Sequence, residues 1–232
     1  MEICKSDFLR QEVIRYLGYK GASADEKIVS LVDRLCDELA ANVVPANVYM
    51  SADCSAEGNT VTIGDLTVKS KDLACHLSGC TSAVILAATL GPVADTLIRR
   101  YSVQDMQKAL VAQAAAAAMI EAYCDTVCDS IEKEIAELSE ISGLYKTTRF
   151  SPGYGDFAIE YQKDILKLLS CEIKIGLTLT EGYMMIPTKS VTAVIGFSAQ
   201  KKMPDKNMPE KNTMKNKCAS CADKKCMFRE AK

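Results

Sequence analysis

The run Ser82-Ala-Val-Ile-Leu-Ala-Ala-Thr89 is almost entirely apolar and is bounded by turn residues on both sides. Such a run is typical of a strand that is buried on both faces of a sheet. Upstream, Asn47–Cys54 and Thr60–Lys69 also favour strands, with turns predicted at Gly58-Asn59 and Gly64-Asp65. Ser82–Thr89 is therefore predicted to be the central strand of a sheet.

Helical segments surround these strands. The chain from Val103 to Ser139 lacks glycine and proline and is rich in alanine, which predicts one long helix or two joined helices. Together these elements predict an α+β fold, a single domain over residues 1–199 with a mixed or antiparallel twisted sheet packed with long helices. Further helices are predicted at Lys5–Leu17, Ser23–Ala41, Ser70–Leu77, after Gly91-Pro92 and at Ala158–Leu169, and further strands at Leu179–Ile186 and Val191–Phe197.

Composition limits the classes of protein to which the chain can belong. Its 232 residues are 48% hydrophobic and 25% charged, with a net charge of −2. This balance gives no electrostatic reason to expect a nucleic-acid partner. The apolar runs are too short to span a bilayer, and the charged N-terminus lacks the apolar core of a signal peptide. We therefore expect a cytoplasmic protein that binds neither membrane nor nucleic acid.

The end of the chain differs in composition from the rest. Residues 200–217 are rich in lysine and predict a flexible basic linker. Residues 218–232 contain Cys218, Cys221 and Cys226. Two thiolates in a C-x-x-C turn converge on one metal ion, and a third extends the set, but zinc and iron–sulfur sites use four ligands. A zinc or iron–sulfur site, redox-active thiols and an incidental cluster all remain open for this tail.

The motifs of several common enzyme classes are missing from the sequence. His76 is the only histidine, so the chain has neither a Ser-His-Asp arrangement nor a local histidine ligand set. It also lacks a Walker A loop and a G-x-G-x-x-G turn after a strand. The sequence therefore gives no support for a hydrolase, a kinase or a dinucleotide-binding dehydrogenase.

The stretch Arg149-Phe-Ser-Pro-Gly-Tyr-Gly-Asp156 combines a fixed cation, a turn and an aromatic ring. Pro152 and Gly153 predict a tight turn. Arg149 offers a planar fork to a carboxylate, and Tyr154 offers a ring face to a base or a cation. The residues alone leave two interpretations open, a small-ligand site and an ordinary loop between helices.

Three blocks resemble one family. Arg149–Asp156 resembles the S-adenosylmethionine-binding signature of the activation domain of cobalamin-dependent methionine synthase. Ile120–Tyr123 upstream, and Leu179–Pro187 followed by Ser190-Val191 downstream, match further blocks of that domain in the same order and at similar spacing. The resemblance extends from about Met106 to Phe197, and the first hundred residues match more loosely.

The resemblance implies roles for individual residues around one ligand. Arg149 would contact the methionyl carboxylate of S-adenosylmethionine, and Glu121 would offset the ligand's ammonium group. Backbone groups at Ser151 and the ring of Tyr154 would frame the ligand. Without the resemblance, Glu121 is equally well interpreted as an exposed acid on a helix surface.

Glu181 and Tyr183 belong to the last matching block. The resemblance places this block near the face that meets cobalamin. The residues alone fit equally a strand with one exposed acid and a methionine-rich core edge formed by Met184 and Met185.

The resemblance implies an activation subunit for reductive remethylation of cobalamin. It would bind S-adenosylmethionine, act on the cobalamin of a methionine synthase or related corrinoid protein, and work with a flavodoxin-like electron donor. The chain is too short to include homocysteine, folate and cobalamin domains, so we expect these on a separate polypeptide. The alternative is a corrinoid-protein-docking electron-transfer module with a metal or iron–sulfur site in its tail.

Overall fold

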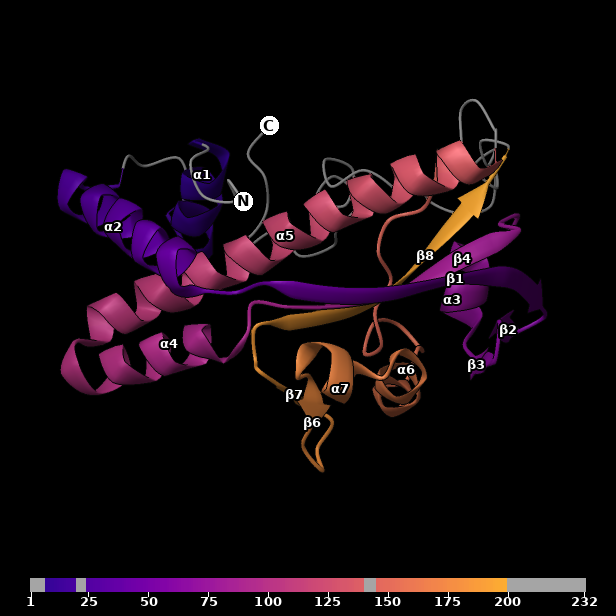
Figure 1. The fold of residues 1–232 in the computed structure, drawn as a ribbon. Coiled ribbons are helices and arrows are strands. Elements are labelled where there is room, and N and C mark those ends of the chain that lie inside the picture. Colours follow the sequence, from indigo (N-terminus) through magenta and orange to yellow (C-terminus); the bar gives the residue numbers. More distant parts are fainter. Residues whose placement is uncertain (1–6, 20–23, 140–144, 200–232) are drawn as a thin grey trace.

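The computed structural model describes residues 7–19, 24–139 and 145–199. Its centre is a sheet in the order β3-β2-β1-β4-β8-β5, in which every neighbouring pair is antiparallel (Figure 1). Helices pack on this sheet, which confirms the predicted α+β class and shows that the sheet is antiparallel. Its strands are β1 (Ala46–Glu57), β2 (Thr60–Ile63), β3 (Leu66–Lys69), β4 (Ser82–Thr89), β5 (Tyr145–Lys146) and β8 (Ser190–Ser198).

The central strand β4 is buried on both faces, as its sequence predicts. Val84 lies in one hydrophobic core and Ile85 lies in the other. Strand β8 continues the pattern, because Ile195 belongs to the first core and Val194 to the second. Successive strand residues point to opposite faces of a sheet, so a strand that separates two cores has no polar face and loses its alternation.

Four helices and one face of the sheet enclose the first core. The N-terminal part of α5 packs with the other three helices, and the rest of α5 lies across the sheet (Figure 1). Alanines are buried where α5 meets its neighbours, within Ala114–Ala118, and their short side chains allow close approach. The four helices are α1 (Asp7–Tyr16), α2 (Glu26–Asn42), α4 (Pro92–Gln104) and α5 (Met106–Ser139).

The segment Val103–Ser139, predicted as one long helix or two joined helices, is almost entirely one long helix, α5, which Asp105 separates from α4, the helix predicted after Gly91-Pro92. Asp105 has an extended backbone with ψ near 99°. Its carboxylate accepts hydrogen bonds from the backbone N–H groups of Gln107 at 3.1 Å and Lys108 at 3.2 Å. A capping aspartate thus begins a new helix without the help of glycine or proline.

The opposite face of the sheet carries smaller elements around the second core (Figure 1). Phe157, Ile165 and Leu169 fill this core together with side chains of β2, β3 and β4. The helix predicted over Ser70–Leu77 is confirmed as α3, and Ser70 caps its N-terminus, because Ser70 Oγ accepts a hydrogen bond from the N–H of Leu73 at 2.9 Å. These elements are α3 (Lys71–His76), α6 (Tyr161–Leu169), α7 (Cys171–Ile175), β6 (Thr178–Leu179) and β7 (Met185–Ile186).

The predicted strand over Leu179–Ile186 is wrong. The segment forms two short strands, β6 and β7, joined by a turn. Thr180 closes the turn, because its Oγ1 accepts a hydrogen bond from the N–H of Met184 at 3.1 Å. Tyr183 has a φ of 61°, which a strand does not permit. In this hairpin Met184 and Ile186 are exposed, whereas Leu179 and Met185 pack against the second core.

Residues 7–19, 24–139 and 145–199 contain no helix that is both long enough and apolar enough to cross a membrane. The predicted linker at residues 200–217 and the tail at residues 218–232, with its three cysteines, lie outside the described residues.

Candidate ligand site beside helix α5

The chain between β5 and the Pro-Gly turn follows the edge of β8. The Thr147 N–H donates to the Gly196 carbonyl at 2.9 Å. Phe150 and Val194 exchange two backbone hydrogen bonds, of 2.9 and 2.8 Å. The backbone of Arg149 is therefore held between two residues that are bonded to β8, and its side chain has a fixed origin.

The tight turn predicted after Arg149 is present. The Tyr154 N–H donates to the Ser151 carbonyl at 3.2 Å, and the Gly153 N–H donates to the Phe157 carbonyl at 2.7 Å. Gly153 has a φ of 92°, and proline followed by a positive-φ glycine is the pattern of a type II turn. The turn leaves the Tyr154 side chain 65% exposed.

Asp156 fastens this loop to the N-terminus of α3. Its carboxylate accepts hydrogen bonds from Ser70 Oγ at 2.5 Å and from the backbone N–H groups of Lys71 at 2.8 Å and Asp72 at 3.0 Å. These bonds, the Ser70 hydroxyl first, lower the pKa of Asp156. Gly155 approaches so closely that an added Cβ would lie 2.1 Å from Asp72 Oδ2.

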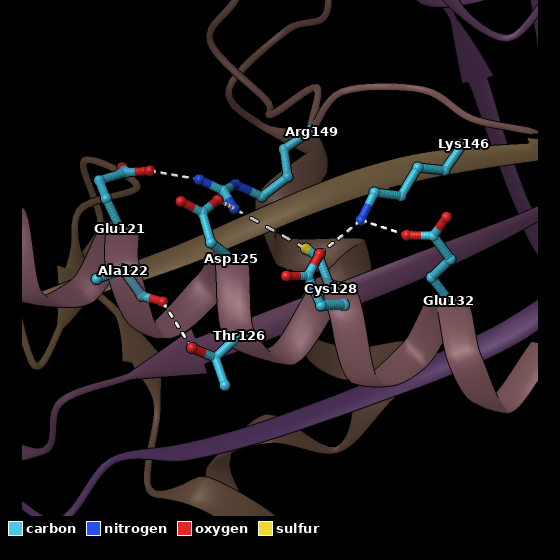
Figure 2. A network of polar contacts seen from close by, with 9 residues as sticks. Glu121, Ala122, Asp125, Thr126, Cys128, Glu132, Lys146 and Arg149 are labelled. Atoms are coloured by element: carbon cyan, nitrogen blue, oxygen red, sulfur yellow. Dashed lines mark hydrogen bonds and ion pairs between the residues drawn. The ribbon is translucent and has the colours of Figure 1, made fainter. Parts of the chain in front are cut away.

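Arg149 reaches two carboxylates on neighbouring turns of α5. Its Nη2 lies 2.6 Å from Glu121 Oε2, and its Nη1 lies 2.5 Å from Asp125 Oδ1, as Figure 2 shows. Burial alone would lower the pKa of Arg149, but its interactions with Asp125, Cys124 and Cys128 together outweigh burial, and the net effect is a raised pKa. Arg149, Glu121 and Asp125 form the Arg149 cluster, which contains one cation and two anions.

The guanidinium of Arg149 still has donors to offer. An arginine carries five N–H donors. Its Nη1 donates to Asp125 and to the Cys128 sulfur at 3.9 Å, and its Nη2 donates once, to Glu121. Nε and one hydrogen of Nη2 thus have no partner among the described residues, and these can receive a further anion.

A second cluster lies further along the same helix. Lys146 of β5 pairs with Asp129 at 2.8 Å and with Glu132 at 2.6 Å (Figure 2). Burial lowers the pKa of Lys146, but hydrogen bonds to Asp129 and Glu132 outweigh it, and the net effect is a raised pKa. Lys146, Asp129 and Glu132 form the Lys146 cluster, which ties the edge strand β5 to α5.

The aromatic side chains of the loop form a row behind the turn. Phe150 packs on Phe157 with ring centroids 6.3 Å apart and on Tyr154 at 6.4 Å. His76 packs on Phe150 at 4.9 Å, and its Nε2 lies 2.7 Å from the Thr148 carbonyl oxygen. The single histidine thus supports the loop and occupies a structural position.

The structure joins only some of the residues predicted for the site. Glu121 contacts Arg149, and Ser151 and Tyr154 follow in the adjoining turn. Glu181 and Tyr183 lie in the β6–β7 hairpin, on the face of the sheet opposite α5 (Figure 1). Within the described residues, no hydrogen bond or ion pair links either of them to Arg149.

Asp125, which completes the Arg149 cluster, is not among the residues predicted for the site. A signal was available, since Asp125 is four residues after Glu121 and lies on the same face of a helix.

The cysteines beside the cluster are poor candidates for chemistry. Burial raises the pKa of Cys124 to about 12 and also raises the pKa of Cys128, so both thiols stay protonated at neutral pH.

The described residues show no metal centre. Across residues 7–19, 24–139 and 145–199, no group of three or more histidine, cysteine, aspartate or glutamate side chains is arranged to hold a metal ion. The predicted ligands Cys218, Cys221 and Cys226 lie outside these ranges, so the metal prediction for the tail stays a prediction.

Comparisons with known proteins identify the family. A crystal structure of the MetH reactivation domain bound to AdoHcy superimposes with a TM-score of 0.58 at 16% sequence identity, covering 84% of this chain and 77% of that chain. At that identity the likeness establishes the fold alone. No curated protein matches the sequence. The model of the vitamin B12 dependent methionine synthase activation domain matches residues 72–203, more than half of the chain. The chain therefore belongs to the family of methionine synthase activation domains.

Proposed function

We propose that this protein binds S-adenosylmethionine at the Arg149 cluster and presents its methyl group to a cobalamin held by a partner protein. Family membership supports this reading, and the structural neighbour is a reactivation domain that binds AdoHcy, the demethylated form of the same ligand. The observation that carries the proposal is the pair of unused Arg149 donors beside an exposed turn.

The ligand's amino acid end fits the polar part of the cluster. Its carboxylate takes the two unused donors of Arg149, which form charge-assisted hydrogen bonds. Its ammonium group approaches Glu121, whose side chain is 49% exposed and has oxygen lone pairs to spare. Arg149 therefore keeps its pairs with α5 while it binds the ligand.

The adjoining turn frames the rest of the ligand. Backbone groups at Ser151 lie two residues from Arg149, and the exposed ring of Tyr154 lies on the same turn. An aromatic face attracts a cation such as a sulfonium. Because the hydrogen bonds of Asp156 fix this turn to α3, the ligand meets a preorganised surface.

Little acid–base chemistry is required of the protein. The thioether that remains when the sulfonium loses its methyl group is a good leaving group, so no general acid has to protonate it. The cobalamin supplies the nucleophile for the methyl group, and the chain supplies binding and alignment. This division agrees with a site whose titratable groups are paired and whose single histidine is structural.

We assign Glu181 and Tyr183 to a contact surface for the cobalamin-bearing partner that is separate from the Arg149 cluster, because their hairpin lies on the face of the sheet opposite α5. Their hairpin presents exposed apolar side chains, including Met184 at 64% exposure, and exposed apolar groups favour protein contacts.

A flavodoxin-like protein is proposed as the electron donor, and the cytoplasm as the site of action. For the tail, we retain the hypothesis of a zinc or iron–sulfur site at Cys218, Cys221 and Cys226.

Titration calorimetry with S-adenosylmethionine tests the proposal. We expect the wild-type protein to bind and Arg149→Ala to lose about 2–4 kcal/mol of binding free energy, since a charge-assisted two-point contact is removed. Lys146→Ala is the matched control, because it removes the cation of the neighbouring cluster. An unchanged dissociation constant in Arg149→Ala, with a folded protein confirmed by circular dichroism, would contradict the proposal.

A further inference from the structure

The Arg149 cluster holds more negative charge than its arginine can neutralise. Glu121 and Asp125 face a single guanidinium, so one negative charge is in excess. The next cation along α5, Lys146, already has two carboxylates of its own and cannot compensate. Arg149 and Lys146 are each paired with two carboxylates, so the exposed surface between Glu121 and Glu132 keeps a net negative charge.

Asp125 has the most exposed side chain in the Arg149 cluster. Its side chain is 63% exposed, whereas Arg149 is 20% exposed. A single oxygen of Asp125, Oδ1, takes the Arg149 hydrogen bond, and Glu121 satisfies the other side of the guanidinium. The charge of Asp125 therefore faces the solvent from which a ligand arrives.

S-adenosylmethionine and its demethylated product differ in charge at one atom. The methyl donor carries a sulfonium, an ammonium and a carboxylate, so its net charge is positive. When the methyl group moves to the nucleophilic metal of the partner's cofactor, the S–CH₃ bond breaks and its electron pair stays on sulfur. The product keeps the ammonium and the carboxylate and is neutral overall.

We propose that Asp125 is a specificity-determining residue whose excess negative charge makes the site prefer the sulfonium-bearing methyl donor over the neutral thioether product. This inference rests on the proposed function. The preference favours replacement of the product by a new methyl donor, because methyl transfer removes the positive charge that the site favours.

The measurement is the ratio of the two dissociation constants, that of the product divided by that of the methyl donor, obtained by calorimetry. Both ligands share the carboxylate, ammonium and adenosine groups, so general damage to the site cancels in the ratio. Asp125→Asn is expected to lower the ratio about two- to fivefold, the range for exposed charge pairs. Raising the salt concentration is expected to lower the wild-type ratio by screening.

Asp129→Asn provides the matched control. Asp129 lies one helical turn beyond Asp125, is 67% exposed and pairs with Lys146 instead of Arg149, so the substitution changes the net charge equally. We expect Asp129→Asn and Asp125→Glu to keep the wild-type ratio. A ratio that Asp125→Asn leaves unchanged, or that both asparagine variants lower equally, would overturn the inference. Equal binding of both ligands to the wild type overturns this inference alone, whereas absence of all binding overturns the proposed function with it.

Discussion

The Arg149 and Lys146 clusters each contain one cation and two carboxylates, yet we propose a ligand only for the Arg149 cluster. Each joins one cation that follows α5 to two carboxylates on α5 (Figure 2). The cations are similarly covered, at 20% exposure for Arg149 and 29% for Lys146. Net charge and burial therefore do not distinguish the two clusters.

The difference lies in donor geometry and in what comes next along the chain. A guanidinium has five donors in a planar fork, while an ammonium has three around one atom. Among the described residues, Arg149 retains two donors after pairing, and the Pro-Gly turn follows it. Lys146 lies in the edge strand β5. A charged cluster becomes a candidate ligand site when it has directed donors left over beside a rigid turn.

The largest effect is expected from exchanging the two kinds of cation. Arg149→Lys keeps the charge but removes the fork, so we expect S-adenosylmethionine affinity to fall about ten- to hundredfold. Lys146→Arg keeps the charge of the other cluster and is expected to leave affinity unchanged. Wild-type affinity in Arg149→Lys would mean that charge alone makes the site.

The next effect concerns the turn that only the Arg149 cluster possesses. Gly155→Ala is expected to cost about 1–3 kcal/mol of unfolding free energy, because the new Cβ displaces the Asp72 carboxylate and the backbone is left-handed. Gly58→Ala is the control, since Gly58 has a similar φ of 61° and nothing within 4 Å of an added Cβ. Urea melts compare the two variants, and equal losses would show that the contact with Asp72 is unimportant.

A smaller change in ligand binding is expected from Glu121, whose carboxylate is proposed to contact both Arg149 and the ligand. Glu121→Gln removes a charge and keeps the shape and some hydrogen bonding, so affinity for S-adenosylmethionine should fall by less than in Arg149→Ala, by about 1 kcal/mol. Calorimetry under the same conditions decides this. If Glu121 serves only the helix surface, the variant and the wild type will titrate identically.

No effect on either cluster is expected from removal of the C-terminal segment. Truncation after Ala199 should leave a protein that melts cooperatively and binds S-adenosylmethionine, because both clusters and both cores lie before that point. We expect any zinc or iron of the full chain, measured by metal analysis of anaerobic protein, to be lost. A truncated chain that fails to fold would place the domain boundary elsewhere, and a metal-free full chain would contradict the tail hypothesis.

The sequence predicted the elements whose local signals agree with the tertiary structure. The apolar run Ser82–Thr89 reads as buried on both faces because two cores lie on either side of it. The Pro152-Gly153 turn follows from backbone preferences that need no tertiary contact. The sequence places the start of the long helix only approximately, near Val103, because the capping residue Asp105 resembles an aspartate on a helix surface.

Two features could not be obtained from the sequence for physical reasons. The sequence predicts a strand at Leu179–Ile186 because patterns assume that apolar residues are buried, whereas Met184 and Ile186 are exposed in a hairpin. The role of Asp125 depends on where the Arg149 side chain reaches, and that is set by the pairing of Phe150 with Val194. A pairing between residues this far apart in the sequence leaves no mark in the local sequence around either residue.

A crystal structure of the protein with S-adenosylmethionine tests the central claim most directly. We expect the ligand carboxylate on Nε and Nη2 of Arg149, at about 2.7–2.9 Å, with the pairs to Glu121 and Asp125 retained and the sulfonium near Tyr154. A ligand bound elsewhere, with Arg149 contacting only α5, would contradict the claim.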